Sequence, residues 1–188
     1  AESLALDLER AANRANREAK TANRVAEFLV DLFEQADPET SRGREVSVRE
    51  IVAVGSERIT RQLADEPLIQ ARLLDTLGGI HWRLGDLPVA SRMLEQALAT
   101  GERERGKEDP ALADVLAHLG AVYVDLGRFD EASVALLRAE KLLAPLSPPP
   151  AEALARILNS RGALAFQQGE LTEAEELFGF VGHALALS

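Results

Sequence analysis

The sequence predicts an all-α fold, an antiparallel helix-pair solenoid of about three 42-residue repeats that follows a long N-terminal helix. Internal repetition carries this prediction, because the segments 73–98, 115–140 and 157–182 resemble one another. Two series of glycines keep the same 42-residue spacing: Gly78, Gly120 and Gly162, then Gly85, Gly127 and Gly169. A fixed period of about 20–50 residues is typical of stacked solenoids, which act by presenting a surface.

Each repeat reads as helix, tight turn, helix. The first glycine lies inside an apolar helix, and the second lies where that helix must stop, because glycine adopts the left-handed conformation at no steric cost. An amphipathic helix follows, with Ala90, Ala132 or Ala174 at the same position. Small residues at these places allow two antiparallel helices to approach closely. We expect units at about 71–106, 110–146 and 151–188.

The middle unit carries the fullest motif: Leu116, Leu119, Gly120, Tyr123, Gly127, Ala132, Leu136 and Ala139. The first unit has His81 in place of the aromatic residue, and the third has Arg161 and Val181 in place of Leu and Ala. This pattern resembles the tetratricopeptide repeat family, although the spacing exceeds that family's usual period of about 34 residues. The resemblance implies a surface on the first helices that holds an extended peptide or a partner helix.

The chain is expected to divide into a long Ala-rich helix (1–36), a linker with a docking helix (37–66) and the solenoid (67–188). Ser47 and Glu50 form a capping-box pattern at the start of the docking helix. The long helix carries an apolar seam at heptad spacing, a candidate for oligomerisation. Its residues are Leu8, Ala12, Ala15, Ala19, Ala22, Ala26 and Leu29. Two interpretations remain open: the seam pairs with another helix, or the helix packs only through its FLVDLF end.

A second resemblance covers residues 25–78, which contain EFLVDLF, Asp37-Pro38, LADEP and ARLLDTLG. This stretch is similar to the segment that leads into the repeats of bacterial serine/threonine protein kinases with C-terminal tetratricopeptide repeats. The resemblance implies a non-catalytic regulatory or sensory region within a kinase. No kinase Gly-rich loop, catalytic loop or Asp-Phe-Gly motif is present in the sequence, so we expect this chain itself not to be an enzyme.

Composition limits the partners and the environment. The net charge is −10, which opposes nucleic-acid binding, although residues 9–24 hold five basic and two acidic side chains. No segment approaches the ~18 apolar residues of a membrane span, so we expect a soluble piece. We expect the longer protein that contains this piece to be cytoplasmic or membrane-anchored. The chain lacks an initiator Met and ends in ALALS, which favours an excised piece of a longer protein.

No cofactor or metal is expected. The three histidines are scattered and cysteine is absent, so no metal-ligand set is evident. The charged stretch 101–109 resembles a phosphate-binding loop only superficially, because Glu108 stands where Ser or Thr is required. We expect a solvated, flexible loop there.

The resemblance places a partner-binding groove on the first helices of the three units. Its candidate residues are Arg72, Asp75, Trp82, Arg83, Asp114, Ala117, Val124, Asp125, Arg156, Asn159, Phe166 and Gln167. Trp82 is the preferred anchor, because tryptophan is enriched at binding hot spots. The competing interpretation is that Trp82 only packs against the preceding helix. The sequence therefore predicts a module that binds a protein or peptide. The alternative is a structural element that forms homodimers through the N-terminal helix and brings kinase domains together.

Overall fold

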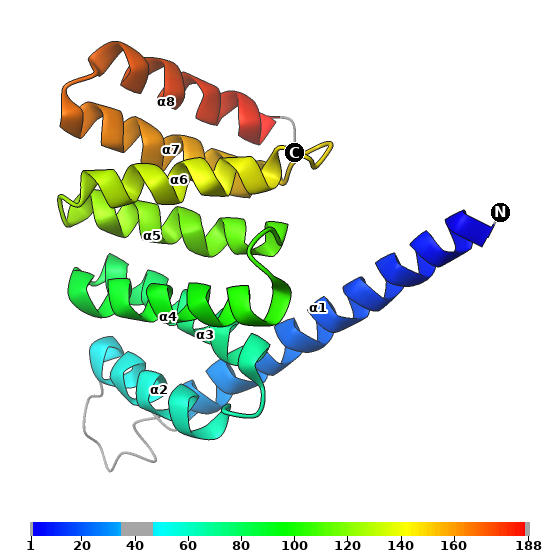
Figure 1. Ribbon diagram of the computed structural model, residues 1–188. Helices are drawn as coiled ribbons and strands as arrows, with labels where there is room; N and C mark the ends of the chain where they lie inside the picture. Colours follow the sequence, from blue (N-terminus) through cyan, green and yellow to red (C-terminus); the bar gives the residue numbers. More distant parts are fainter. Residues whose placement is uncertain (1, 35–46, 187–188) are drawn as a thin grey trace. The chain divides into compact units, whose positions relative to one another are not determined.

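The computed structural model describes residues 2–34 and 47–186, whose regular elements are all helices, with no strand among them (Figure 1). The elements are α1 (Glu2–Glu34), α2 (Val48–Gln62), α3 (Pro67–Arg83), α4 (Leu87–Arg105), the 3₁₀ helix η1 (Pro110–Leu112), α5 (Ala113–Asp125), α6 (Phe129–Leu143), α7 (Ala151–Gln168) and α8 (Leu171–Ala186). The all-α helix-pair solenoid is confirmed. The chain divides into two compact units, residues 1–73 and 74–188.

Unit 1 contains α1 and α2, which contact each other. Arg58 of α2 holds them together, since its Nη2 lies 2.7 Å from Asp31 Oδ2 and its guanidinium lies over the Phe28 ring. The predicted capping box is present, with the Glu50 N–H donating to Ser47 Oγ and the Glu50 carboxylate accepting from the Ser47 N–H. The first ten residues of the expected 37–66 segment lie outside the described residues.

Unit 2 is a series of antiparallel helix pairs, as Figure 1 shows for α5 with α6 and for α7 with α8. Successive pairs stack because α5 contacts α4 on one side and α7 on the other, while α7 also contacts α6. The core is aliphatic, and Leu94, Leu136 and Ile157 are fully buried. Each pair therefore depends on its neighbour to bury its apolar face.

Within each pair the two helices meet at a glycine. A Cβ on Gly120 would lie 2.5 Å from Leu136 Cγ, and one on Gly78 would lie 2.8 Å from Leu94 Cγ. In the last pair the side chain that fills the space above Gly162 is Phe178, at 2.7 Å. These distances are too short for any real Cβ, so the first glycine of each repeat is required for close packing. The predicted reason for the 42-residue spacing of these glycines, which is the close approach of two antiparallel helices, is confirmed.

The second glycine of each repeat lies in the turn between the paired helices. Gly85, Gly127 and Gly169 have φ values of 79°, 71° and 84°, in the left-handed region that side chains disfavour. Around Gly127, the Arg128 N–H donates to the carbonyl of Tyr123, which closes the helix end. The predicted helix, turn and helix therefore share one backbone plan in all three pairs.

The prediction of a flexible loop at 101–109 is wrong for residues 101–105, because α4 continues to Arg105. Glutamate and arginine propagate a helix well, and the missing Cβ of Gly101 leaves room for Leu112 of η1. Gly101 is accordingly buried. Glu102 is also tied down, since it pairs with Arg138 of α6.

We expect Gly120→Ala to destabilise the chain by about 1–3 kcal/mol, because the new methyl group would overlap Leu136. Gly179→Ala is the matched control, since Gly179 lies in α8 with no neighbour near its would-be Cβ. There alanine should stabilise by up to about 1 kcal/mol through its helix propensity. Urea unfolding measures both. Equal effects of the two substitutions would contradict the close-packing role of Gly120.

Candidate protein-binding surface

The candidate groove residues occupy four repeated positions on the first helices of the pairs, α3, α5 and α7. Trp82, Val124 and Phe166 share one position, and Arg83, Asp125 and Gln167 share the next. Asp75 shares its position with Ala117 and Asn159, and Arg72 shares its position with Asp114 and Arg156. Arg72 belongs to unit 1, where it is exposed. The others belong to unit 2, and we call them the first-helix surface.

A chain of polar contacts crosses this surface from α3 to α7. His118 Nδ1 lies 2.7 Å from Asp75 Oδ1, and Arg156 Nη1 lies 3.0 Å from His118 Nε2. The Arg156 guanidinium can only donate and the ionised Asp75 carboxylate can only accept, so the His118 ring lies between a cation and an anion. Asp114 lies 3.8 Å from Arg156 Nη2 and completes the row. His118 thus connects three successive pairs.

Trp82 makes a second contact between repeats. Its Nε1 donates to Asp125 Oδ2 at 2.6 Å. The bond joins α3 to α5, so Trp82 does more than pack on its own pair, and its ring stays half-buried. Asp75 to His118 and Trp82 to Asp125 are both separated by 43 residues, one repeat plus one. The two contacts therefore join equivalent places on neighbouring pairs.

The remaining candidates differ in how much surface they offer. Val124 is only 5% exposed and packs with Ala132, Leu136 and Leu164, so a ligand would find little of it. Arg83, Asn159 and Gln167 are exposed, and Phe166 is 59% exposed. Arg83 makes no ion pair with any residue in the described part of the chain. The first-helix surface therefore combines a hydrogen-bonded frame with exposed polar and aromatic groups.

Tyr123 lies on α5 among charged side chains of α4 and α6. Its hydroxyl donates to Glu95 Oε1 at 3.0 Å, and the Arg128 guanidinium lies 4.2 Å above its ring. Burial, with the Glu95 hydrogen bond, raises the pKa of Tyr123 to about 12. Sequence reasoning recognised Tyr123 only as a repeat-pattern aromatic, and it missed the role of His118 altogether.

This geometry agrees with the comparison with known families. Residues 69–144 match the tetratricopeptide repeat family. The matched segment holds the first two pairs. The third pair lies outside the match but keeps the glycine contact and the left-handed turn glycine of the other two. No curated protein shows significant similarity to the chain.

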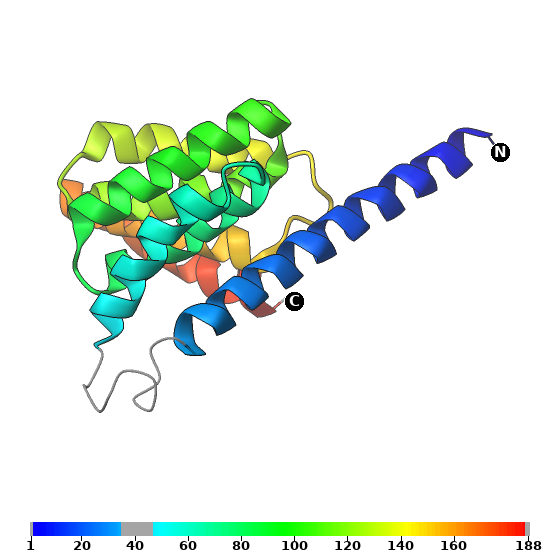
Figure 2. The same ribbon diagram turned by 90° about the horizontal axis from the view of Figure 1, so that it is seen from below.

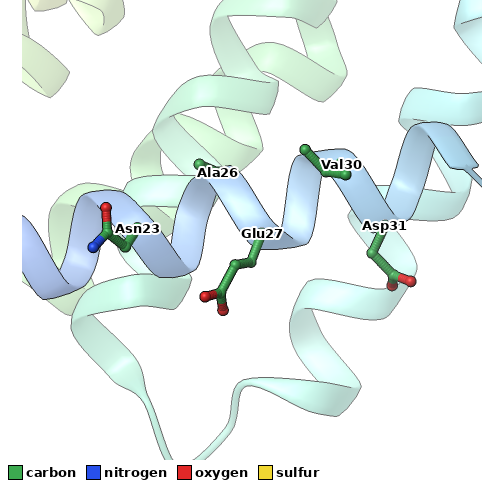
Figure 3. Close-up of a pocket in the computed structure, with 5 residues that line it drawn as sticks. All are labelled: Asn23, Ala26, Glu27, Val30 and Asp31. Atoms are coloured by element: carbon green, nitrogen blue, oxygen red, sulfur yellow. The ribbon is translucent and has the colours of Figure 1, made fainter.

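In unit 1, residues of α1 line a hollow of about 470 Å³ (Figure 3). Ala26 and Val30 project to one side of the helix, and Glu27 and Asp31 to the other, as Figure 3 shows. Val30 is 56% exposed. The helix itself is one continuous rod (Figure 2). The hollow therefore adjoins an exposed apolar strip of α1.

The described residues contain no group of three potential metal ligands. His81 is buried in the first repeat, where its Nδ1 lies 3.5 Å from Asp86 Oδ2. Glu173, near the start of α8, pairs with Arg161 of α7. No helix among the described residues is long and apolar enough to cross a membrane. Glu173 and Arg161 thus serve a contact between helices.

We expect the single tyrosine of the chain to titrate near pH 12 in the folded protein, as followed by ultraviolet absorbance. Because the folded pKa exceeds the value of 10.0 for an unperturbed phenol, the stability contributed by neutral Tyr123 is complete below pH 10 and is lost between pH 10 and 12. Glu95→Gln should lower the pKa, since an amide lacks the charge that opposes ionisation. Titration of the folded protein near pH 10 would contradict this account.

Proposed function

We propose that the chain is a protein-binding module whose first-helix surface forms a groove for a peptide or a partner protein. The row of contacts from Asp75 through His118 to Arg156 carries this proposal. A recognition surface built from several repeats must keep its side chains in register, and these hydrogen bonds hold three helices in register. Tetratricopeptide repeats generally mediate protein–protein interaction, which supports the same function.

The exposed groups provide the means of recognition. Trp82 presents a ring that its bond to Asp125 holds in place, which lowers the entropy lost when a ligand binds. Arg83 is available to a carboxylate of the ligand, and an arginine can bind that group with two parallel hydrogen bonds. Asn159 and Gln167 add donors and acceptors on α7. We infer a ligand with at least one acidic group and one apolar anchor.

The module is further proposed to be the non-catalytic region of a bacterial serine/threonine protein kinase. Support comes from the resemblance of residues 25–78 to the segment that precedes the repeats in such kinases. Recruitment of a substrate or regulator to the kinase is the role that follows. The kinase would supply the catalysis, and the repeats would supply selectivity.

A second candidate function is self-association through α1, which would bring two kinase domains together. The observation that favours it is the exposure of the alanines of the seam, Ala12, Ala15, Ala19, Ala22 and Ala26. Leu29 is half-buried, and the side chain of Leu8 lies outside the described residues. Alanine permits close approach of two helices but buries little apolar area, so such a dimer would be weak.

Affinity capture from lysate of the source organism, followed by titration of the captured protein, tests the groove. Trp82→Ala should weaken binding by about 2 kcal/mol, roughly thirtyfold. Trp82→Phe keeps an aromatic ring but loses the donor to Asp125 and one of the two fused rings, so it should cost less than Trp82→Ala. Val134→Ser is the control, since Val134 is an exposed apolar residue of α6. A loss below a few fold for Trp82→Ala would sink the groove assignment.

Light scattering across a concentration series tests the second candidate. We expect a dimer that Ala19→Asp converts to monomer, because a carboxylate in the seam would be desolvated without a partner. Asn13→Asp adds the same charge at another exposed position of α1 and should leave the dimer intact. A strict monomer at high concentration argues against self-association through this helix.

A further inference from the structure

An exposed face of α6 carries two apolar side chains between opposite charges. Asp130, Val134, Leu137 and Lys141 follow one another at spacings of four, three and four residues, so they lie on one side of the helix. Val134 is 69% exposed and Leu137 is 52% exposed, and both charged residues are exposed as well. We call these four residues the α6 stripe. The other side of the helix is buried in the core.

The neighbouring pairs show what the repeat carries at these places. Forty-two residues before the two apolar residues, α4 exposes Arg92 and Glu95, and 42 residues after them α8 exposes Glu176 and Gly179. The place therefore faces solvent in all three pairs, and the packing of the repeat does not require apolar side chains there. Figure 1 shows α6 in the middle of the stack, with described pairs on both sides of its own pair. The exposure of the α6 stripe thus does not arise at an end of the chain.

The charges of the α6 stripe are not used within the described structure. Asp130 and Lys141 form no ion pair with any residue that the structure describes, whereas the adjacent Glu131 pairs with Arg128. Asp130 lies in the first turn of α6 and Lys141 in the last, where each charge suits the helix dipole. The dipole accounts for the charges, but it leaves the two exposed apolar side chains between them without a role.

We propose that the α6 stripe is a self-association surface, on which a second copy of the chain packs its own α6 in the antiparallel direction about a two-fold axis. The stripe is self-complementary, because Asp130 lies four residues before Val134 and Lys141 lies four residues after Leu137. In the antiparallel contact Val134 of one copy faces Leu137 of the other, and Asp130 faces Lys141. A two-fold axis makes each of these pairings occur twice.

Symmetry favours a second copy over another occupant. A helix of a different protein would need the same order of acidic, apolar, apolar and basic residues, and a second copy supplies that order automatically. The contact is nevertheless weak, because two apolar side chains per copy bury little area and the net charge of −10 repels two chains at a distance. We expect a dissociation constant above roughly 1 µM. The stripe lies on a second helix, so this contact leaves the first-helix surface free.

The test measures the dissociation constant of the full chain by sedimentation equilibrium. Each chain carries Ala19→Asp, so that the seam of α1 makes no contribution. Self-association through α1 alone then gives a monomer, and association through the α6 stripe gives a dimer. Val134→Ser should raise the dissociation constant at least tenfold, since both copies lose an apolar contact. Val54→Ser is the matched control, because Val54 of α2 is also an exposed valine, at 51%.

Charge reversal separates a contact between copies from an effect on folding. Asp130→Lys alone sets lysine against lysine, and Lys141→Asp alone sets aspartate against aspartate, so each variant should dissociate at least tenfold more readily. An equal mixture of the two variants should restore the dimer, since both lysines of one chain then face aspartates of the other. A substitution that only disturbed the folding of α6 would not be repaired by mixing.

Three results would each overturn the proposal. They are a strict monomer at about 1 mM chain, equal effects of Val134→Ser and Val54→Ser, and a mixture of the two charge variants that associates no better than either variant alone. None of these substitutions changes a residue of the first-helix surface. Failure of the dimer is therefore distinct from failure of the proposed groove.

Discussion

The close contact between a glycine on the first helix and a large side chain on the second is the constraint on which the repeat stack depends. At Gly120 the space that a Cβ would take belongs to Leu136, which is fully buried. The pair can then present one compact apolar face to the helix that follows. Leu164 of α7 meets that face directly. Loss of the contact would separate the paired helices and would also displace the next pair.

Because the stacking is regular, polar side chains one repeat plus one residue apart come into contact. Trp82 reaches Asp125, and Asp75 reaches His118, each across 43 residues. The same regularity gives Phe178 of α8 the position of the buried Leu136 of α6, and both fill the space above the glycine of their own pair. One geometric period thus produces a row of polar contacts between neighbouring pairs along the first helices.

Much of the fold could be predicted from the sequence, because glycine and the helix caps act locally. The 42-residue glycine spacing predicted both the close contacts and the left-handed turns, and the Ser47 capping box was readable from two residues. The helical conformation of residues 101–105 could not be predicted in this way, since it depends on Leu112 packing against Gly101. The Trp82 to Asp125 bond and the position of His118 between Asp75 and Arg156 were also missed. Both follow from side-chain directions across two helices, which a single sequence does not specify.

Photo-crosslinking would test the central claim, that the first-helix surface binds the partner. A photoreactive amino acid at Asn159 places the probe on α7 among the proposed contacts, and one at Val134 places it on the exposed side of α6. Both positions are exposed, so neither substitution should disturb packing. The account predicts that the captured partner crosslinks at Asn159 and not at Val134. Crosslinking at Val134 alone would contradict it.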